Sequence, residues 1–103
     1  MNILNEGHRY MLQNFEDKTG GQEIQFIQKA PTSPASIELE TVSDGTTNEE
    51  VLAMLIDRLS YLQAKFPCRE NALVITKLEE SLMWLNERTR KRQSRGVEGK
   101  QIA

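Results

Sequence analysis

Two series of apolar residues at helical spacing, one on each side of a proline, constrain the fold of this chain most strongly. Within each series the residues recur at steps of three and four positions, which places them on one face of an α-helix. Pro67 disfavours helical backbone geometry at the residue before it. We therefore predict helices over about 48–66 and 69–95 that pack along these faces as an antiparallel hairpin. The first series is Leu52, Leu55, Leu59, Leu62 and Phe66, and the second is Ile75, Leu78, Leu82 and Leu85.

The ends of both predicted helices carry residues that commonly begin or end helices. Thr46, Thr47 or Asn48 can cap the first helix, and two glutamates follow in its first turn, where the helix dipole favours negative charge. Gly96 stands where a glycine in the left-handed conformation often ends a helix. We expect a short tail after it.

The residues before the helices predict a small β-structure. Residues 23–28 and 37–42 alternate apolar and polar side chains and are separated by a linker with two prolines, so we expect an antiparallel β-hairpin. Residues 1–20 show no sustained period and are interpreted as a flexible N-terminal arm. The predicted fold class is α+β, with this small hairpin and the long two-helix hairpin forming a single domain over residues 21–103.

Such a small chain has little core of its own. With 103 residues, two strands and two helices, it needs a covalent link or a partner subunit for stability. Cys68 has no second cysteine for a disulfide, so we expect a homo-oligomer in a reducing, cytosolic compartment. Trp84 lies beside the predicted helical interface, and the strands, another subunit or a ligand could each pack against it.

Motifs for catalysis, metal binding and membrane insertion are missing from the sequence. His8 has no nucleophile motif around it, Cys68 has no neighbouring histidine, and the glycine-rich phosphate-binding and H-E-x-x-H patterns do not occur. No segment approaches the roughly 20 apolar residues of a membrane span, and the N-terminus does not resemble a signal peptide. We expect a binding protein rather than an enzyme, with no cofactor, no metal and no contact with membranes.

Charge is distributed unevenly along the chain. Residues 1–87 contain 7 Lys and Arg against 14 Asp and Glu, whereas residues 88–103 contain 6 against 1. Nucleic-acid polymers are held mainly through their phosphates, so a chain whose bulk is acidic is a poor general binder of them. We therefore expect a local anion site and no nucleic-acid polymer as a partner.

Five cations near the end of the second predicted helix form the candidate anion site. Arginine predominates among them, and its planar guanidinium group suits bidentate recognition of phosphate. Arg88 and Arg92 are i,i+4 neighbours that can hold one anion together. Favourable charge at a helix C-terminus explains the cluster equally well, so both interpretations stay open. The cluster comprises Arg88, Arg90, Lys91, Arg92 and Arg95.

Aromatic and amide side chains near the predicted inter-helix turn could complete a nucleotide pocket. Tyr61 lies off the apolar series, so we expect its ring to be exposed and able to stack on a base. Asn71 could read the edge of that base or could simply begin the second helix. Phe66 fits the apolar series, which favours a core position over a ligand contact.

Several segments of the chain resemble a phage family. The stretch Arg69-Glu-Asn-Ala-Leu-Val-Ile-Thr-Lys-Leu-Glu-Glu-Ser-Leu-Met-Trp-Leu-Asn-Glu-Arg, continued by Arg92-Gln-Ser-Arg-Gly-Val-Glu-Gly, resembles a helical-hairpin domain shared by Thoeris anti-defence sponges and anti-CBASS cyclic-nucleotide sponges. The segments Asp44-Gly-Thr-Thr-Asn-Glu-Glu-Val and Gln22-Glu-Ile-Gln-Phe-Ile look like the Thoeris members in particular. The resemblance covers about residues 21–100.

The resemblance implies a function and a set of contacts. Thoeris anti-defence sponges hold cyclic ADP-ribose isomers with a glycosidic linkage, without degrading them, and form hexamers; some bind cyclic di- or trinucleotides at separate sites. Sequestration of such signals in the cytoplasm of an infected bacterium is the expected function. The alternative is a phage adaptor or regulatory protein with an RNA- or protein-docking basic helix. The implied signal contacts are Tyr61 (with Phe66 as substitute), Asn71, Arg58 and Trp84, and the implied cyclic-oligonucleotide contacts are Arg88, Arg92 and Arg95.

Overall fold

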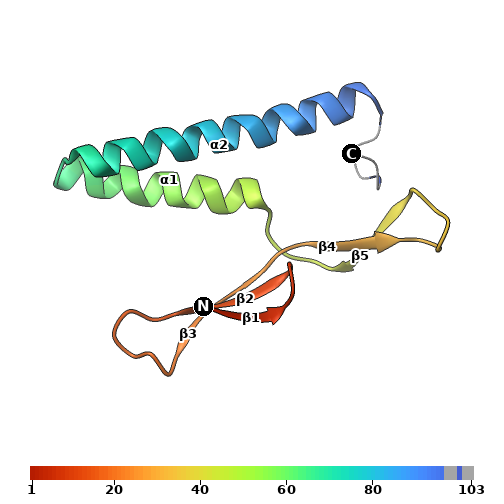
Figure 1. The fold of residues 1–103 in the computed structure, drawn as a ribbon, viewed down its shortest axis with the longest axis horizontal. Coiled ribbons are helices and arrows are strands. Elements are labelled where there is room, and N and C mark those ends of the chain that lie inside the picture. The colour runs from red at the N-terminus through yellow and green to blue at the C-terminus, as the bar shows by residue number, and fades with distance from the viewer. Residues whose placement is uncertain (97–99, 101–103) are drawn as a thin grey trace. The chain divides into compact units, whose positions relative to one another are not determined.

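The computed structural model describes residues 1–96 and Lys100, which fall into two compact units. The first unit contains the strands and the second contains the helices, so the fold class is α+β as predicted (Figure 1). The two helices have almost the bounds that the apolar series predicts. The elements are β1 (Asn2–Asn5), β2 (Arg9–Gln13), β3 (Gly21–Gln25), β4 (Gln28–Pro31), β5 (Leu39–Ser43), α1 (Asn48–Lys65) and α2 (Arg69–Ser94).

Strands β1, β2 and β3 form an antiparallel sheet in that order. Tyr10 lies opposite both Ile3 and Ile24, so all three side chains share one face of the sheet. The Tyr10 and Phe26 rings meet edge to face, at a centroid distance of 5.9 Å. The neighbouring positions of β2 and β3 point to the other face, where Arg9, Glu23 and Gln25 are polar and Met11 is apolar.

The prediction of an N-terminal arm without strands is wrong. Residues 1–20 contain β1 and β2, and Gly7 turns the chain between them with a φ of 78°. The register between β1 and β2 shifts between Ile3 and Asn5, which interrupts the alternation of side chains along β1. Strands of four and five residues with such an irregularity leave no sustained period in the sequence.

The predicted pairing of residues 23–28 with residues 37–42 is also wrong. The segment is divided after Gln25: β3 pairs with β2, and only β4 pairs with β5, in a separate two-stranded sheet. The division is held by the chain just before α1. The N–H of Thr46 donates to the carbonyl of Gln25 at 2.8 Å, and the N–H of Ile27 donates to the carbonyl of Thr46 at 2.9 Å.

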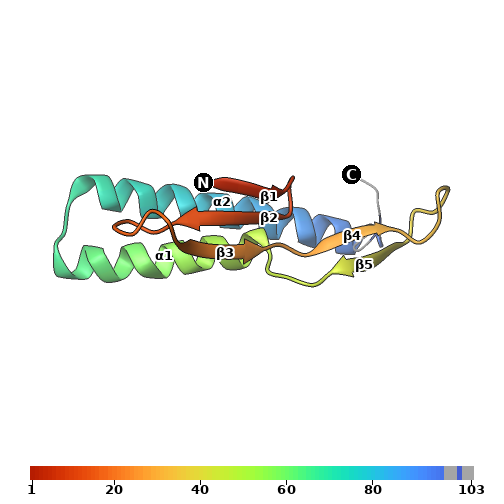
Figure 2. The ribbon, with the colours of Figure 1, turned by 90° about the horizontal axis from the view of Figure 1, so that it is seen from below.

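Helices α1 and α2 pack side by side as an antiparallel hairpin (Figure 2). The turn between them is clamped by Gln63, whose amide nitrogen donates to the carbonyl of Cys68 and whose amide oxygen accepts from the N–H of Cys68, both at 3.0 Å. Cys68 is the N-cap of α2, since its Sγ accepts the N–H of Asn71 at 3.4 Å. Gly96 follows α2 with a φ of 70°, which confirms the predicted left-handed ending.

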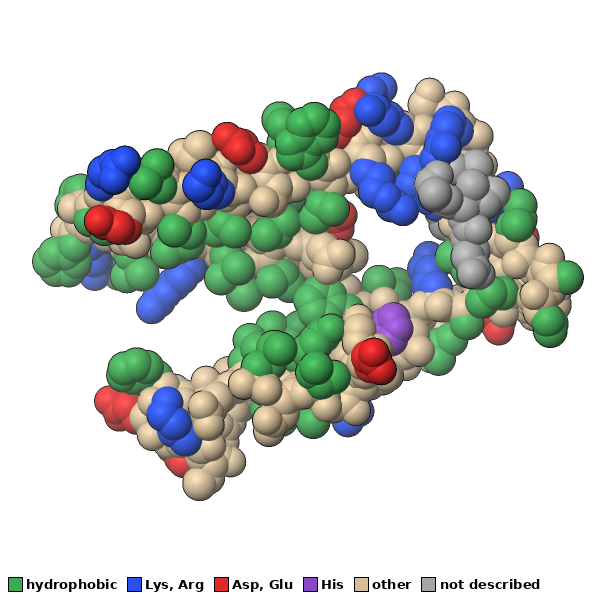
Figure 3. Space-filling model, in the orientation of Figure 1, with side chains coloured by type: hydrophobic (Ala, Val, Ile, Leu, Met, Phe, Trp, Pro, Cys, Tyr) green, Lys and Arg blue, Asp and Glu red, His purple; other side chains and the backbone are tan. Residues whose placement is uncertain are grey.

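The seam between the helices is only partly covered. Most of its leucines and Ile75 are half-buried, and Leu55 is exposed. Phe66 is 79% exposed, so its predicted core position is wrong, because α1 ends at Lys65 before the series reaches it. In the described part of the chain no hydrophobic side chain is fully buried. Hydrophobic side chains are accordingly visible along the helical hairpin (Figure 3).

Across the described residues, neither helix combines the length and the apolar character that a bilayer span requires.

Candidate ligand-binding surfaces

The second helix extends beyond the first. Helix α2 has 26 residues and α1 has 18, and a short turn joins them, so about eight residues of α2 run past the start of α1. At 1.5 Å per residue this overhang is about 12 Å long. It begins near Glu87 and contains most of the cation cluster, and Lys and Arg side chains gather over this end of α2 (Figure 3).

The cations of the overhang divide into two sets. Arg90 forms a bidentate ion pair with Glu87, with Nε to Oε2 at 2.9 Å and Nη2 to Oε1 at 2.6 Å. The hydrogen bond from Arg90 holds the pKa of the Glu87 carboxyl below its usual value. At 100° per residue the remaining four cations lie on a different side of the helix. We call this side the basic face, and it consists of Arg88, Lys91, Arg92 and Arg95.

Burial differs within the basic face. Arg88 and Lys91 are exposed, as is Arg95, which is the C-cap residue of α2. Arg92 is only 7% exposed and is the one buried polar or charged residue in the described part of the chain. A cation held at low exposure interacts more strongly with an anion than a solvated one does, because water screens it less.

Tyr61 presents its ring on the outer side of α1. It is 55% exposed, which confirms the exposure predicted from its position off the seam. The Nζ of Lys65, one turn later, lies 4.7 Å from the centroid of the ring. Arg58 lies one turn before Tyr61 and is exposed, as is Met54. We call Met54, Arg58, Tyr61 and Lys65 the aromatic face of α1.

The predicted partner of Tyr61 lies elsewhere on the hairpin. Asn71 is in the first turn of α2, one turn before the seam residue Ile75, and is half-buried. A single chain therefore holds Tyr61 and Asn71 on different faces. Phe66 is exposed in the turn, and Trp84 is 64% exposed on α2, one turn before Arg88, with most of its indole surface uncovered.

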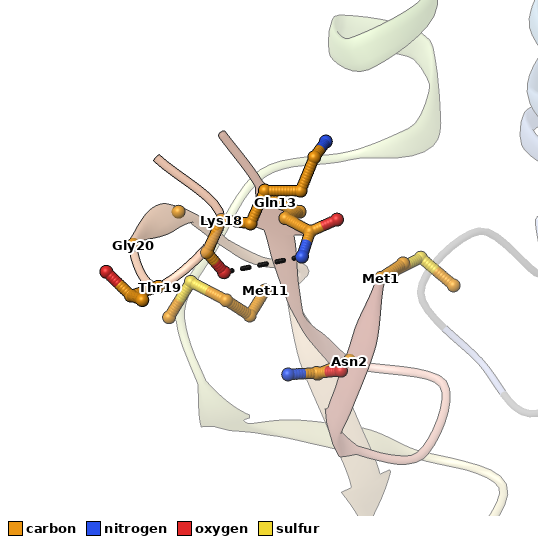
Figure 4. Close-up of a pocket in the computed structure, with 8 residues that line it drawn as sticks. Met1, Asn2, Met11, Gln13, Lys18, Thr19 and Gly20 are labelled. Atoms are coloured by element: carbon orange, nitrogen blue, oxygen red, sulfur yellow. Dashed lines mark hydrogen bonds between the residues drawn. The ribbon is translucent and has the colours of Figure 1, made fainter. Parts of the chain in front are cut away.

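Two hollows were not predicted from the sequence. The larger, of about 620 Å³, opens on the helical hairpin, and its lining includes Leu82, Met83 and both members of the Glu87–Arg90 ion pair. The i,i+3 spacing of that pair was the signal available in the sequence. The smaller, of about 170 Å³, lies on the first sheet, where Gln13 donates to the carbonyl of Lys18 at 3.3 Å (Figure 4). It is below the 300–1,000 Å³ usual for small-molecule sites.

Residues 1–96 and Lys100 contain no group of three or more His, Cys, Asp or Glu side chains placed to hold a metal ion.

Comparison with known proteins identifies similar sequences. The family model described as the Acb2/Tad1 hairpin domain matches residues 22–90, which run from β3 into the overhang of α2. A protein named Thoeris anti-defense 1, from Bacillus phage SBSphiJ7, is 60% identical over 58 residues. Those residues are 55% of this chain and 41% of that protein, so the chain matches about two fifths of the relative's length. Strands β1 and β2 lie outside the family match.

Proposed function

Because the chain belongs to the Acb2/Tad1 hairpin-domain family, we propose that it is a phage-encoded anti-defence sponge. In this role it sequesters cyclic ADP-ribose-type immune signals, and cyclic oligonucleotides at a second site, without cleaving them. The observation that carries the proposal is the exposed ring of Tyr61, which stands between two cations on a helix inside the matched region. The name of the similar Bacillus phage protein, Thoeris anti-defense 1, points to the same class.

The aromatic face of α1 has the chemistry that such a signal requires. A cyclic ADP-ribose isomer carries an adenine base and two phosphates. The Tyr61 ring can stack on the base, an interaction worth about 1–3 kcal/mol by alanine substitution. Arg58 and Lys65 supply positive charge one turn away on either side of the ring, and the Asn71 amide supplies a directed polar contact.

The basic face of α2 is proposed as the second site. Arg88 and Arg92 are i,i+4 neighbours, and Arg95 continues the same side of the helix. Guanidinium groups recognise phosphate bidentately, which suits a cyclic oligonucleotide with one phosphate per nucleotide. Arg90 takes no part in the proposed site because Glu87 already engages it.

We propose that the chain forms a homo-oligomer, and that this oligomer is a hexamer. Half-buried seam residues and the uncovered Trp84 support association, since a second copy would remove this apolar surface from water. Tyr61 and Asn71 lie on different faces of one chain, so a pocket that contains both must be completed by another copy. Light scattering should give a mass near six chains, and a monomer at micromolar concentration would refute the intersubunit pocket.

The direct test is calorimetric titration with the glycosidically linked cyclic ADP-ribose isomer. A sponge that depletes a signal at about 1 μM needs a binding free energy beyond about −8 kcal/mol. Tyr61→Ala should raise Kd about 5- to 150-fold through lost stacking. The matched control is Phe15→Ala, which removes another exposed aromatic ring, on the β2–β3 connection, and should leave Kd unchanged.

The same complex tests for cleavage. Ligand released by heating should show the mass and chromatographic mobility of the starting compound. Recovery of a hydrolysed product would contradict sequestration. Absence of any binding would favour the adaptor alternative.

A further inference from the structure

We propose that Lys65 is an exchangeable cation of the signal site. Its ammonium group occupies the Tyr61 ring when no ligand is bound, and it moves onto a ligand phosphate when a base takes its place. The inference rests on the proposed function, because it uses Tyr61 as the stacking ring. It adds a residue that discriminates phosphate-bearing nucleotides from neutral nucleosides.

The geometry that motivates this inference lies within one helix. Tyr61 and Lys65 are i,i+4 neighbours on α1, and the Nζ of Lys65 stands 4.7 Å from the centroid of the Tyr61 ring. Lys65 is the last residue of α1, and the turn that follows is clamped by the two hydrogen bonds between Gln63 and Cys68. The backbone at Lys65 is thus fixed, and the four-carbon side chain is the part that can move.

The relative strengths of the two ring contacts favour exchange. An exposed cation–π contact corresponds to only about a two- to fivefold preference. Stacking of a nucleobase corresponds to about a 5- to 150-fold effect on affinity when the aromatic ring is removed. An adenine base therefore displaces the ammonium from the ring face. The displaced Nζ stays within a side-chain length of the base, where the phosphates of the same ligand lie.

Discrimination between nucleosides and the signal depends on whether the ligand offers the displaced Lys65 ammonium a new partner. A neutral nucleoside must displace Lys65 without supplying another partner for its charge. A cyclic ADP-ribose isomer displaces the ammonium and then accepts hydrogen bonds from it through a phosphate. Arg58, one turn before Tyr61, can meet the phosphates from the other side of the ring. Lys65 consequently weakens binding of nucleosides and strengthens binding of the signal.

The test compares two ligands on one variant, Lys65→Met. Methionine removes the charge and keeps an unbranched side chain with good helix propensity. Adenosine, followed by NMR shifts of the Tyr61 ring, should bind about two- to fivefold more tightly to the variant than to the wild type. The glycosidically linked cyclic ADP-ribose isomer, followed by calorimetry, should bind about tenfold more weakly, as for a lost charge-assisted hydrogen bond.

Lys77→Met is the matched control, since Lys77 is also an exposed helical lysine but lies on α2. It should change neither affinity. Unchanged or weakened adenosine binding in Lys65→Met would overturn the exchange, as would an unchanged affinity for the cyclic ADP-ribose isomer. If the wild-type protein binds no cyclic ADP-ribose isomer at all, the proposed function itself is refuted, and the exchange at Lys65 with it. Circular dichroism melts ensure that each variant is folded at the titration temperature.

Discussion

Alanine at position 45 should disrupt the connection between the two sheets. A Cβ atom added at Gly45 would lie 2.7 Å from the carbonyl carbon of Phe26 and closer still to the carbonyl oxygen of Gln25. Both neighbours are backbone atoms, so neither can swing aside as a flexible side chain could. The chain must move apart at the point where Thr46 exchanges hydrogen bonds with Gln25 and Ile27.

The magnitude follows from those two hydrogen bonds, at 2.8 and 2.9 Å. Each typically contributes about 0.5–1.5 kcal/mol, so losing both should lower the free energy of unfolding by about 1–3 kcal/mol. Urea denaturation at a fixed protein concentration measures the loss. Hydrogen exchange should locate it, with faster exchange at the amides of Ile27 and Thr46.

Gly20→Ala is the matched control for this prediction. A Cβ atom added at Gly20 would lie 3.0 Å from the side-chain amide nitrogen of Asn14, and this side chain can move away. We expect a change within about 0.5 kcal/mol, as for ordinary surface substitutions. Equal stability of the Gly45→Ala and Gly20→Ala variants would refute the reasoning from close backbone approach.

Three further predictions concern the helical hairpin. Gln63→Ala removes both hydrogen bonds to Cys68 and should lower the free energy of unfolding by about 1 kcal/mol in urea titrations, since the bonds are exposed. The hydrogen bond from Arg90 lowers the pKa of the Glu87 carboxyl. The ion pair therefore stabilises the fold above the ordinary carboxyl pKa, and this stability is lost as pH falls through the lowered pKa. Glu87→Gln should flatten the decline of the melting temperature between about pH 5 and pH 3. Arg88→Gln should weaken cyclic trinucleotide binding about tenfold in calorimetry. Arg90→Gln should bind the cyclic trinucleotide as the wild type does, because Arg90 is already engaged by Glu87.

The helices could be predicted from the sequence because their signal is long and repeated. An apolar step of three and four persists across each helix, and Pro67 and Gly96 mark where each helix ends. The strands have four or five residues each, too few for a period to stand out. The division between β3 and β4 could not be predicted, because it depends on hydrogen bonds from Thr46, about twenty residues later.

The candidate site shows the same contrast. The exposure of Tyr61 follows from helical geometry alone, since its position falls outside the apolar series. Helical geometry, at 100° per residue, likewise predicts that Arg90 and Arg88 lie on different sides of α2. The pairing of Arg90 with Glu87 could not be predicted in this way, because it depends on the positions of the two side chains. The half-burial of Asn71 depends on where α2 begins relative to α1, which the turn determines.

The helix cap formed by a thiol has a practical consequence. Cys68 is the one cysteine of the sequence, and a spectroscopist would choose it for attaching a fluorophore or spin label. Its sulfur, however, already accepts the first-turn N–H of Asn71. A maleimide adduct or an oxidised sulfur alters that acceptor, so the reporter group would perturb the helix start that it was meant to observe. Preparations kept under reductant, and labels introduced at a new cysteine far from the turn, preserve the native hairpin.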